Sequence, residues 1–169
     1  MTPNPSGWQA IARAIAKAIK PRLSSPRSPQ PSAPKEYPGD FTGRFDIVYD
    51  PHPDQLPDPG EVVWTWVPYE EDHTQGKDRP VVIVGRDAAW LLALPMTSKD
   101  HDLDAAQEAS EGRYWVDIGT GDWDRSGRPS EVRVNRVLRV DPHRVRRTAG
   151  KLDQSRFAEV AKGIQEHFA

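Results

Sequence analysis

The sequence predicts a mainly β protein with some α structure, namely a small β-barrel closed by one C-terminal helix. Two observations favour this fold class. About five short segments rich in β-branched and aromatic residues are separated by turn-forming residues between positions 61 and 140. A single amphipathic segment then follows them near the C-terminus. The length of 169 residues fits one domain with appendages.

The appendages lie at the N-terminus. Gly7–Lys20 has the spacing of an amphipathic basic helix, which Pro21 ends. We expect it either to bind a partner or a surface, or to pack loosely on its own domain. The next residues are rich in Pro and Ser, and Phe41–Tyr49 is predicted to be a short strand. We therefore divide the chain into the helix (1–20), a linker with an irregular segment (21–57) and the barrel (58–169).

Charge and composition exclude several classes of site and function. The net charge is −2, although residues 1–35 carry six basic and no acidic side chains, so any nucleic-acid contact requires a local basic patch. The chain has no Cys, which excludes disulfides, thiolate metal sites and Cys nucleophiles, and its five His residues show no ligand spacing. No apolar run reaches the ~20 residues of a membrane span. We expect a soluble cytoplasmic protein without a metal or cofactor.

The barrel begins with a strand at Glu61–Pro68, which is aromatic and β-branched. A polar loop at Tyr69–Asp78 follows it. The next two strands are predicted at Val81–Val84 and Trp90–Leu94, with a turn between them at Gly85–Asp87.

The second half of the domain starts with a polar acidic loop at Lys99–Gly112. Strands are then predicted at Tyr114–Ile118 and at Glu131–Val140, the latter with a bulge near Asn135–Arg136, where the alternation slips. The last element is the amphipathic helix Gln154–Phe168, with Asp153 as its N-cap.

The hairpin in the middle of the chain carries the most specific site prediction. Arg79 stands just before its first strand and Thr97 just after its second. An antiparallel hairpin brings such positions to one edge, because opposed residues lie only about 5 Å apart. A guanidinium and a hydroxyl at one edge can bind a phosphate group.

Four segments in register resemble the PemK/MazF-type toxins of bacterial toxin–antitoxin systems. The first two are Gly60-Glu-Val-Val-Trp and Gln75-Gly-Lys-Asp-Arg-Pro-Val-Val-Ile-Val. The others are Leu94-Pro-Met-Thr-Ser and Val134-Asn-Arg-Val-Leu-Arg-Val-Asp with Gly150-Lys-Leu-Asp. The similarity covers about residues 58–169, and the signatures at Trp64-Thr-Trp and Ile118-Gly-Thr-Gly-Asp-Trp-Asp are typical of an actinobacterial branch.

This resemblance implies an SH3-like barrel, a homodimer and a cognate antitoxin. It also implies metal-free cleavage of single-stranded RNA, in which the ribose 2′-OH attacks the neighbouring phosphate. Arg79 would stabilise the developing phosphoryl charge or act as general acid, and Thr97 would donate to a phosphoryl oxygen. The residues expected to contact RNA are Ser98, Lys77, Gln75 and Lys99.

One departure from the family pattern concerns the general base. Members often carry Glu five residues before the Arg, and Thr74 occupies that position here. His73, Glu71 and Glu61 are the candidates for the base, and the sequence does not choose among them. Trp123 and Tyr69 could stack on bases, although a Trp more often packs in a core or an interface. The alternative function is a catalytically inactive barrel that binds nucleic acid or a protein.

Overall fold

The structure is a computed structural model that describes residues 36–98 and 105–168. These residues all fall within one compact unit. The predicted helix Gly7–Lys20, most of the Pro-rich linker and the candidate Lys99 lie outside the described residues.

Within this part of the chain, seven strands form one antiparallel sheet with the order β4-β5-β3-β2-β1-β7, and β6 pairs with β3. Two α-helices and one 3₁₀ turn accompany the strands. The strands are β1 (Glu61–Pro68), β2 (Gly76–Asp87), β3 (Trp90–Thr97), β4 (Trp115–Gly119), β5 (Ser130–Arg133), β6 (Leu138–Val140) and β7 (Arg147–Lys151). The helical elements are α2 (Ala105–Ser110), η3 (Pro142–Arg144) and α3 (Gln154–His167). The predicted fold class, mainly β with a C-terminal helix, is confirmed.

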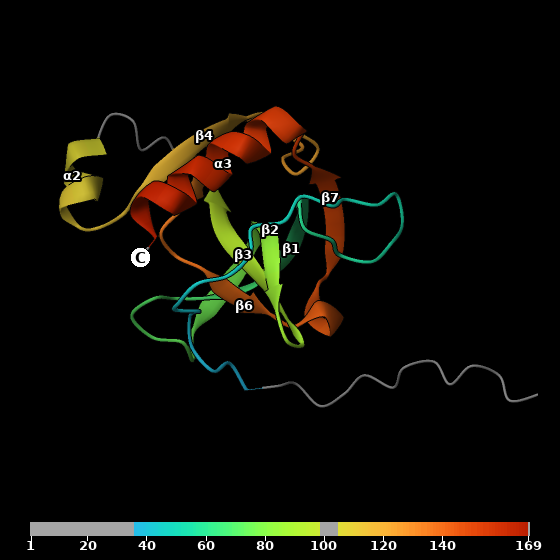
Figure 1. The fold of residues 1–169 in the computed structure, drawn as a ribbon, viewed down its shortest axis with the longest axis horizontal. Coiled ribbons are helices and arrows are strands. Elements are labelled where there is room, and N and C mark those ends of the chain that lie inside the picture. The colour runs from blue at the N-terminus through green and yellow to red at the C-terminus, as the bar shows by residue number, and fades with distance from the viewer. Residues whose placement is uncertain (1–35, 99–104, 169) are drawn as a thin grey trace, which may run out of the picture. The chain divides into compact units, whose positions relative to one another are not determined.

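The core lies on both faces of the central strands. One cluster packs Val82, Leu92 and Leu94 of the sheet against Phe157 and Val160 of α3. A smaller cluster on the opposite face joins alternate residues of the same strands to β6. Figure 1 shows α3 running along β4 and covering one side of the sheet.

The C-terminal helix follows its prediction closely. Asp153 is the N-cap, and its carboxylate accepts a hydrogen bond of 2.8 Å from the backbone N–H of Arg156. The predicted apolar face is buried at Phe157, Val160 and Ile164.

The central hairpin is longer than predicted, and its turn lies elsewhere. Asp87 pairs with Trp90, which places the turn at Ala88 and Ala89 rather than at Gly85–Asp87. Ala88 adopts the positive φ of 52° that this turn requires. Gly85 instead lies in β2, where the backbone of Asp46 passes so closely that a Cβ would lie 2.7 Å from its carbonyl oxygen. The glycine therefore serves a close approach and not a turn.

The predicted strand Glu131–Val140 is two strands. β5 ends at Arg133, residues 134–137 make a corner, and β6 begins at Leu138. β5 pairs with β4 and with the end of β3, whereas β6 pairs with the start of β3. The slip in alternation thus marks a change of position in the sheet and not a bulge.

Three described elements, β7, α2 and the 3₁₀ turn η3, were absent from the sequence prediction. β7 is an edge strand of small and polar residues, of which only Ala149 is buried, so it lacks the apolar alternation of a strand. The short helix α2 lies within the predicted acidic loop and buries none of its residues.

Residues 36–50, here called the N-terminal strap, pack on the barrel without forming the predicted strand at Phe41–Tyr49. Only Phe41 forms a β-bridge, to Val137. Tyr49 packs against the Phe157 ring at 5.0 Å and donates a 2.7 Å hydrogen bond to the carbonyl of Leu152. The strap, which starts in blue in Figure 1, is irregular in backbone but continuous with the core.

Two short findings complete the fold. No helix among the described residues is long and apolar enough to span a membrane. Within residues 36–98 and 105–168, no group of three or more His, Asp or Glu side chains is placed to hold a metal ion.

Candidate active site

The site lies where β2 and β3 separate. The two strands are paired as far as Val81 and Pro95, after which β3 pairs with β5 at Met96 and Thr97. A cavity of about 630 Å³ is present at this point, and both Arg79 and Thr97 line it. We call it the Arg79 cavity. The structure therefore brings the two predicted residues to one site, although they are not paired in the sheet.

Arg79 is half-buried, and its guanidinium has no hydrogen bond or ion pair with any residue that the structure describes. Burial lowers the pKa of this guanidinium, the charge of Arg136 lowers it further, and Tyr69 opposes the shift. Arginine nevertheless remains protonated at neutral pH. The cavity therefore contains a partly desolvated cation that no described carboxylate neutralises.

Four further basic side chains surround Arg79 in the lining: Lys77, Arg125, Arg128 and Arg147. Arg128 is bound to Asp124 at 3.0 Å, and the Arg147 guanidinium lies 5.2 Å from the centre of the Trp64 ring. The other two are exposed and pair with no described residue. Together with Arg79, these side chains form a local basic patch of the kind that a nucleic-acid contact would require.

One residue of the lining, Trp64, carries an unsatisfied donor. The indole N–H of Trp64 is buried, and no described residue accepts a hydrogen bond from it. A buried donor without a partner is unfavourable, and such groups in a native protein often have a functional role.

The family follows from a comparison with known proteins. Residues 58–168 match the family model described as PemK-like, MazF-like toxin of type II toxin–antitoxin system. The chain belongs to this family. The matched region contains every element from β1 to α3 and all the residues of the Arg79 cavity, whereas the N-terminal strap precedes it.

Solved structures of MazF proteins show distant likenesses to this family member. MazF from Deinococcus radiodurans is 20% identical with a TM-score of 0.47, and the match covers 67% of this chain and 96% of that one. The MazE–MazF complex from the same organism gives 19% identity, a TM-score of 0.45 and the same two coverages. The Mycobacterium tuberculosis toxin MazF-mt6 is 19% identical with a TM-score of 0.40, and the match covers 62% of this chain and 94% of that one. No curated protein matches at a significant level.

The three candidates for the general base lie outside the Arg79 cavity. Glu61 is buried at the start of β1, where its carboxylate accepts a 3.0 Å hydrogen bond from the backbone N–H of Asp58. Glu71 is exposed in the β1–β2 loop. His73 lies 3.8 Å from Asp40 and packs edge-on against Tyr37, beside a different cavity.

Of the other residues predicted to contact RNA, some line the Arg79 cavity and some do not. Ser98 and Lys77 line the Arg79 cavity. Gln75 closes the β1–β2 loop through its backbone and does not reach the lining. Trp123 also lines the cavity, although it is only 3% exposed, belongs to the core and donates its indole N–H to Ser130.

The β1–β2 loop next to the cavity is held by ion pairs. Glu70 accepts two hydrogen bonds from Arg133, of 2.6 and 3.0 Å. This bidentate pair lowers the pKa of the Glu70 carboxyl. Arg136, buried beside it, donates to Asp40 and to the carbonyl of Pro68. The negative charge of this loop is thus partly neutralised at Glu70.

Sequence reasoning missed Trp64, Arg125, Arg128 and Arg147 as site residues. They come from β1, from the loop after Trp123 and from β7, which no local pattern brings together. Only their charge or aromatic character could have indicated a role in the site, and charged side chains are too frequent on protein surfaces for this to single them out.

Proposed function

We propose that the chain is an endoribonuclease toxin that cleaves single-stranded RNA without a metal ion. The observation that carries the proposal is Arg79, a half-buried cation without a described partner that lines a basic cavity together with Thr97. A phosphodiester is the ligand class that such a set of donors fits best. Membership of a toxin family supports this assignment.

In the proposed reaction, the ribose 2′-oxygen forms a bond to phosphorus and the bond from phosphorus to the 5′-oxygen breaks. The products are a 2′,3′-cyclic phosphate and a free 5′-OH. Negative charge grows on the phosphoryl oxygens in the transition state, so fixed donors placed there lower the barrier. Arg79 and the Thr97 hydroxyl would supply these donors.

The reaction needs a group that accepts the 2′-OH proton and another that protonates the leaving 5′-oxygen. The carboxylates in the lining of the cavity are Asp78 and Asp124, the latter held by Arg128. We place the proton acceptor at one of these two, since the earlier candidates His73, Glu71 and Glu61 do not line the cavity. Arg79 would assist the leaving group.

Partners follow from the same family. A toxin of a type II system is paired with a protein antitoxin, so we propose a cognate antitoxin for this chain, together with the homodimer that the resemblance implied. We also propose the cytoplasmic location that the composition led us to expect. A cytoplasmic RNA is then both substrate and binding partner.

The decisive test is cleavage of a mixed-sequence single-stranded RNA with EDTA present. We expect the intact protein to leave 5′-OH ends and Arg79→Ala to lower the rate by about 10²–10³, because it removes a transition-state donor. Thr97→Val should also lower it. Arg86→Ala is the matched control, since Arg86 is exposed, contacts Asp58 and lies outside the cavity.

A second candidate function is a barrel that binds RNA or a protein without turnover. The absence of His73, Glu71 and Glu61 from the cavity favours it. RNA that survives a folded, antitoxin-free preparation at high concentration would overturn the nuclease and leave this candidate.

A further inference from the structure

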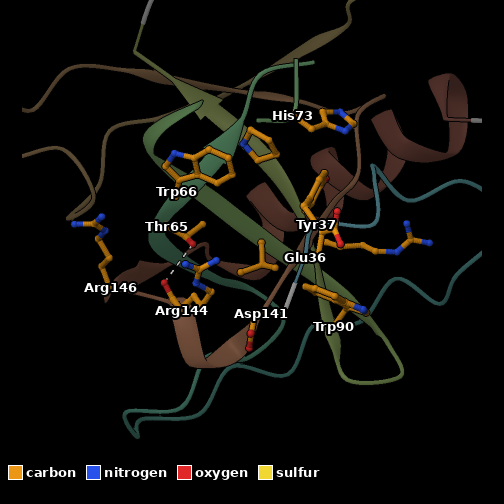
Figure 2. A pocket seen from close by; sticks show the side chains of 12 residues that line it. Glu36, Tyr37, Thr65, Trp66, His73, Trp90, Asp141, Arg144 and Arg146 are labelled. Atoms are coloured by element: carbon orange, nitrogen blue, oxygen red, sulfur yellow. Dashed lines mark hydrogen bonds between the residues drawn. The ribbon is translucent and has the colours of Figure 1, made fainter. Parts of the chain in front are cut away.

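A second cavity, of about 500 Å³, lies beside the first and has no role in the proposed reaction. We call it the Trp66 cavity. Figure 2 shows Trp66, Thr65 and Arg144 on one side of it and Tyr37 and Trp90 on the other. The strap thus supplies part of this wall through Tyr37, which precedes the region matched by the family model.

The two cavities adjoin across neighbouring strands. Thr65 of β1 lines the Trp66 cavity and is paired in the sheet with Arg79, which lines the other. Neighbouring strands are only about 4.8 Å apart. Arg146 of the Trp66 cavity also binds Asp78 of the Arg79 cavity, with 3.1 Å between Nε and Oδ1. The linings of the two cavities therefore meet at neighbouring residues of β1 and β2.

The lining of the Trp66 cavity suits a base with its phosphate. Trp66 is 40% exposed, one of the few large apolar side chains of the described chain that are open to solvent. Its ring is held in place by β2, because a Cβ at Gly76 would lie only 2.7 Å from it. The Arg144 guanidinium makes no ion pair or hydrogen bond with the described residues. A fixed aromatic face beside a free cation is the arrangement by which proteins bind single-stranded nucleic acid.

We propose that the Trp66 cavity binds a nucleobase of the RNA near the scissile phosphate, by stacking on Trp66 and by contact of Arg144 with the adjoining phosphate. The inference rests on the proposed function, since RNA is the ligand of both cavities. Because the Trp66 cavity does not touch the reacting phosphate, it contributes to RNA affinity and not to the chemical step.

The test measures binding separately from cleavage. The probe is a mixed-sequence single-stranded 2′-O-methyl RNA, which lacks the attacking hydroxyl. We expect Trp66→Ala to raise the Kd by about tenfold or more, the usual effect of losing a base-stacking partner. Arg144→Ala should raise it and make binding less salt-dependent. In cleavage of ordinary RNA, both variants should raise KM and leave kcat close to that of the intact protein.

Two controls separate stacking from folding. Trp66→Tyr keeps an aromatic face and should bind nearly as the intact protein does. Arg86→Ala removes an exposed arginine that lines neither cavity and should not change Kd.

Unchanged Kd in both Trp66→Ala and Arg144→Ala, or failure of the intact protein to bind the probe, would overturn this inference. If RNA is cut but the variants bind normally, only the inference fails, and the cavity remains available to a protein side chain. Binding that depends on Trp66 without any cleavage would overturn only the proposed nuclease.

Discussion

At the scale of single residues, burial decides how charged groups behave in this protein. The Glu61 carboxylate is 6% exposed, and its partner is a backbone N–H rather than a cation. Arg79 is the complementary case, a cation held partly out of water without a described carboxylate. The fold stabilises the buried Glu61 carboxylate only by a hydrogen bond, whereas the proposed RNA substrate would neutralise the charge of Arg79.

Glu61 leads to a prediction about the pH dependence of stability. Burial raises the pKa of Glu61, and the neighbouring Asp58 and Asp54 charges act in the same direction. The folded state therefore favours the protonated form, so this contribution to stability is present below the ordinary pKa of Glu and is lost as pH rises through the folded value. We expect Glu61→Gln to be more stable than the intact protein at neutral pH, by on the order of 1 kcal/mol.

Denaturant unfolding at several pH values measures this effect. The advantage of Glu61→Gln should disappear at low pH, because both proteins are then neutral at this position. An advantage that is equal at all pH values would contradict the role assigned to burial.

At the scale of elements, the strap and β2 depend on each other through one close contact. Phe45 and the backbone of Asp46 cross directly over Gly85, and the backbone N–H of Val48 donates to the carbonyl of Val84 at 2.9 Å. A side chain at position 85 would occupy the space that the strap uses. The strap therefore packs on this strand only because the strand carries a glycine there.

Gly85→Ala tests this contact. The added Cβ would lie 2.7 Å from the Asp46 carbonyl oxygen, so the strap must move, and we expect a loss of about 1–3 kcal/mol of stability. Hydrogen exchange should show lost protection at the Val48 amide and unchanged protection at the Leu152 amide, which bonds to Gly60. Equal loss at both amides would mean that the contact is not local.

At the scale of the whole molecule, residues outside the family match contribute to one core with the residues inside it. Phe41 is 9% exposed and belongs to the same cluster as Val137 and α3, and Phe45, Ile47 and Tyr49 pack against that cluster. Polar contacts add to this, because Asp40 pairs with the buried Arg136 at 2.8 Å. The core of this domain is therefore completed by strap residues that precede the region matched by the family model.

Truncation tests this dependence. We expect a chain that starts at residue 58 to lose at least about 5 kcal/mol relative to one that starts at residue 36, since burial of each large apolar side chain is worth roughly 1.5–3 kcal/mol. Arg136 would also lose its carboxylate partner. Thermal and denaturant unfolding of the two purified chains measures the difference. Equal stability would show that residues 58–169 form a self-sufficient domain.

Local pattern was sufficient for β1 and α3. The β-branched and aromatic residues of β1 favour a strand, and the apolar face of α3 repeats with the helical period of 3.6. The edge strand β7 leaves no such trace, since its conformation depends on the strand beside it. The corner after Arg133 leaves only a slip in the alternation, which does not distinguish a bulge from a change of position in the sheet. Asp40 and Arg136 are 96 residues apart, and nothing local indicates that they meet.

The sequence by itself determined the fold class through short-range periodicity and the family resemblance through four motifs in register. It also placed Arg79 and Thr97 at one site, because hairpin geometry brings the two strand ends together. Only the tertiary structure decided which side chains surround Arg79, that His73, Glu71 and Glu61 stand apart from it, and that a second cavity adjoins the first. The physical reason is that a site's lining is gathered from strands and loops distant in the chain, whose positions follow from packing around a common core.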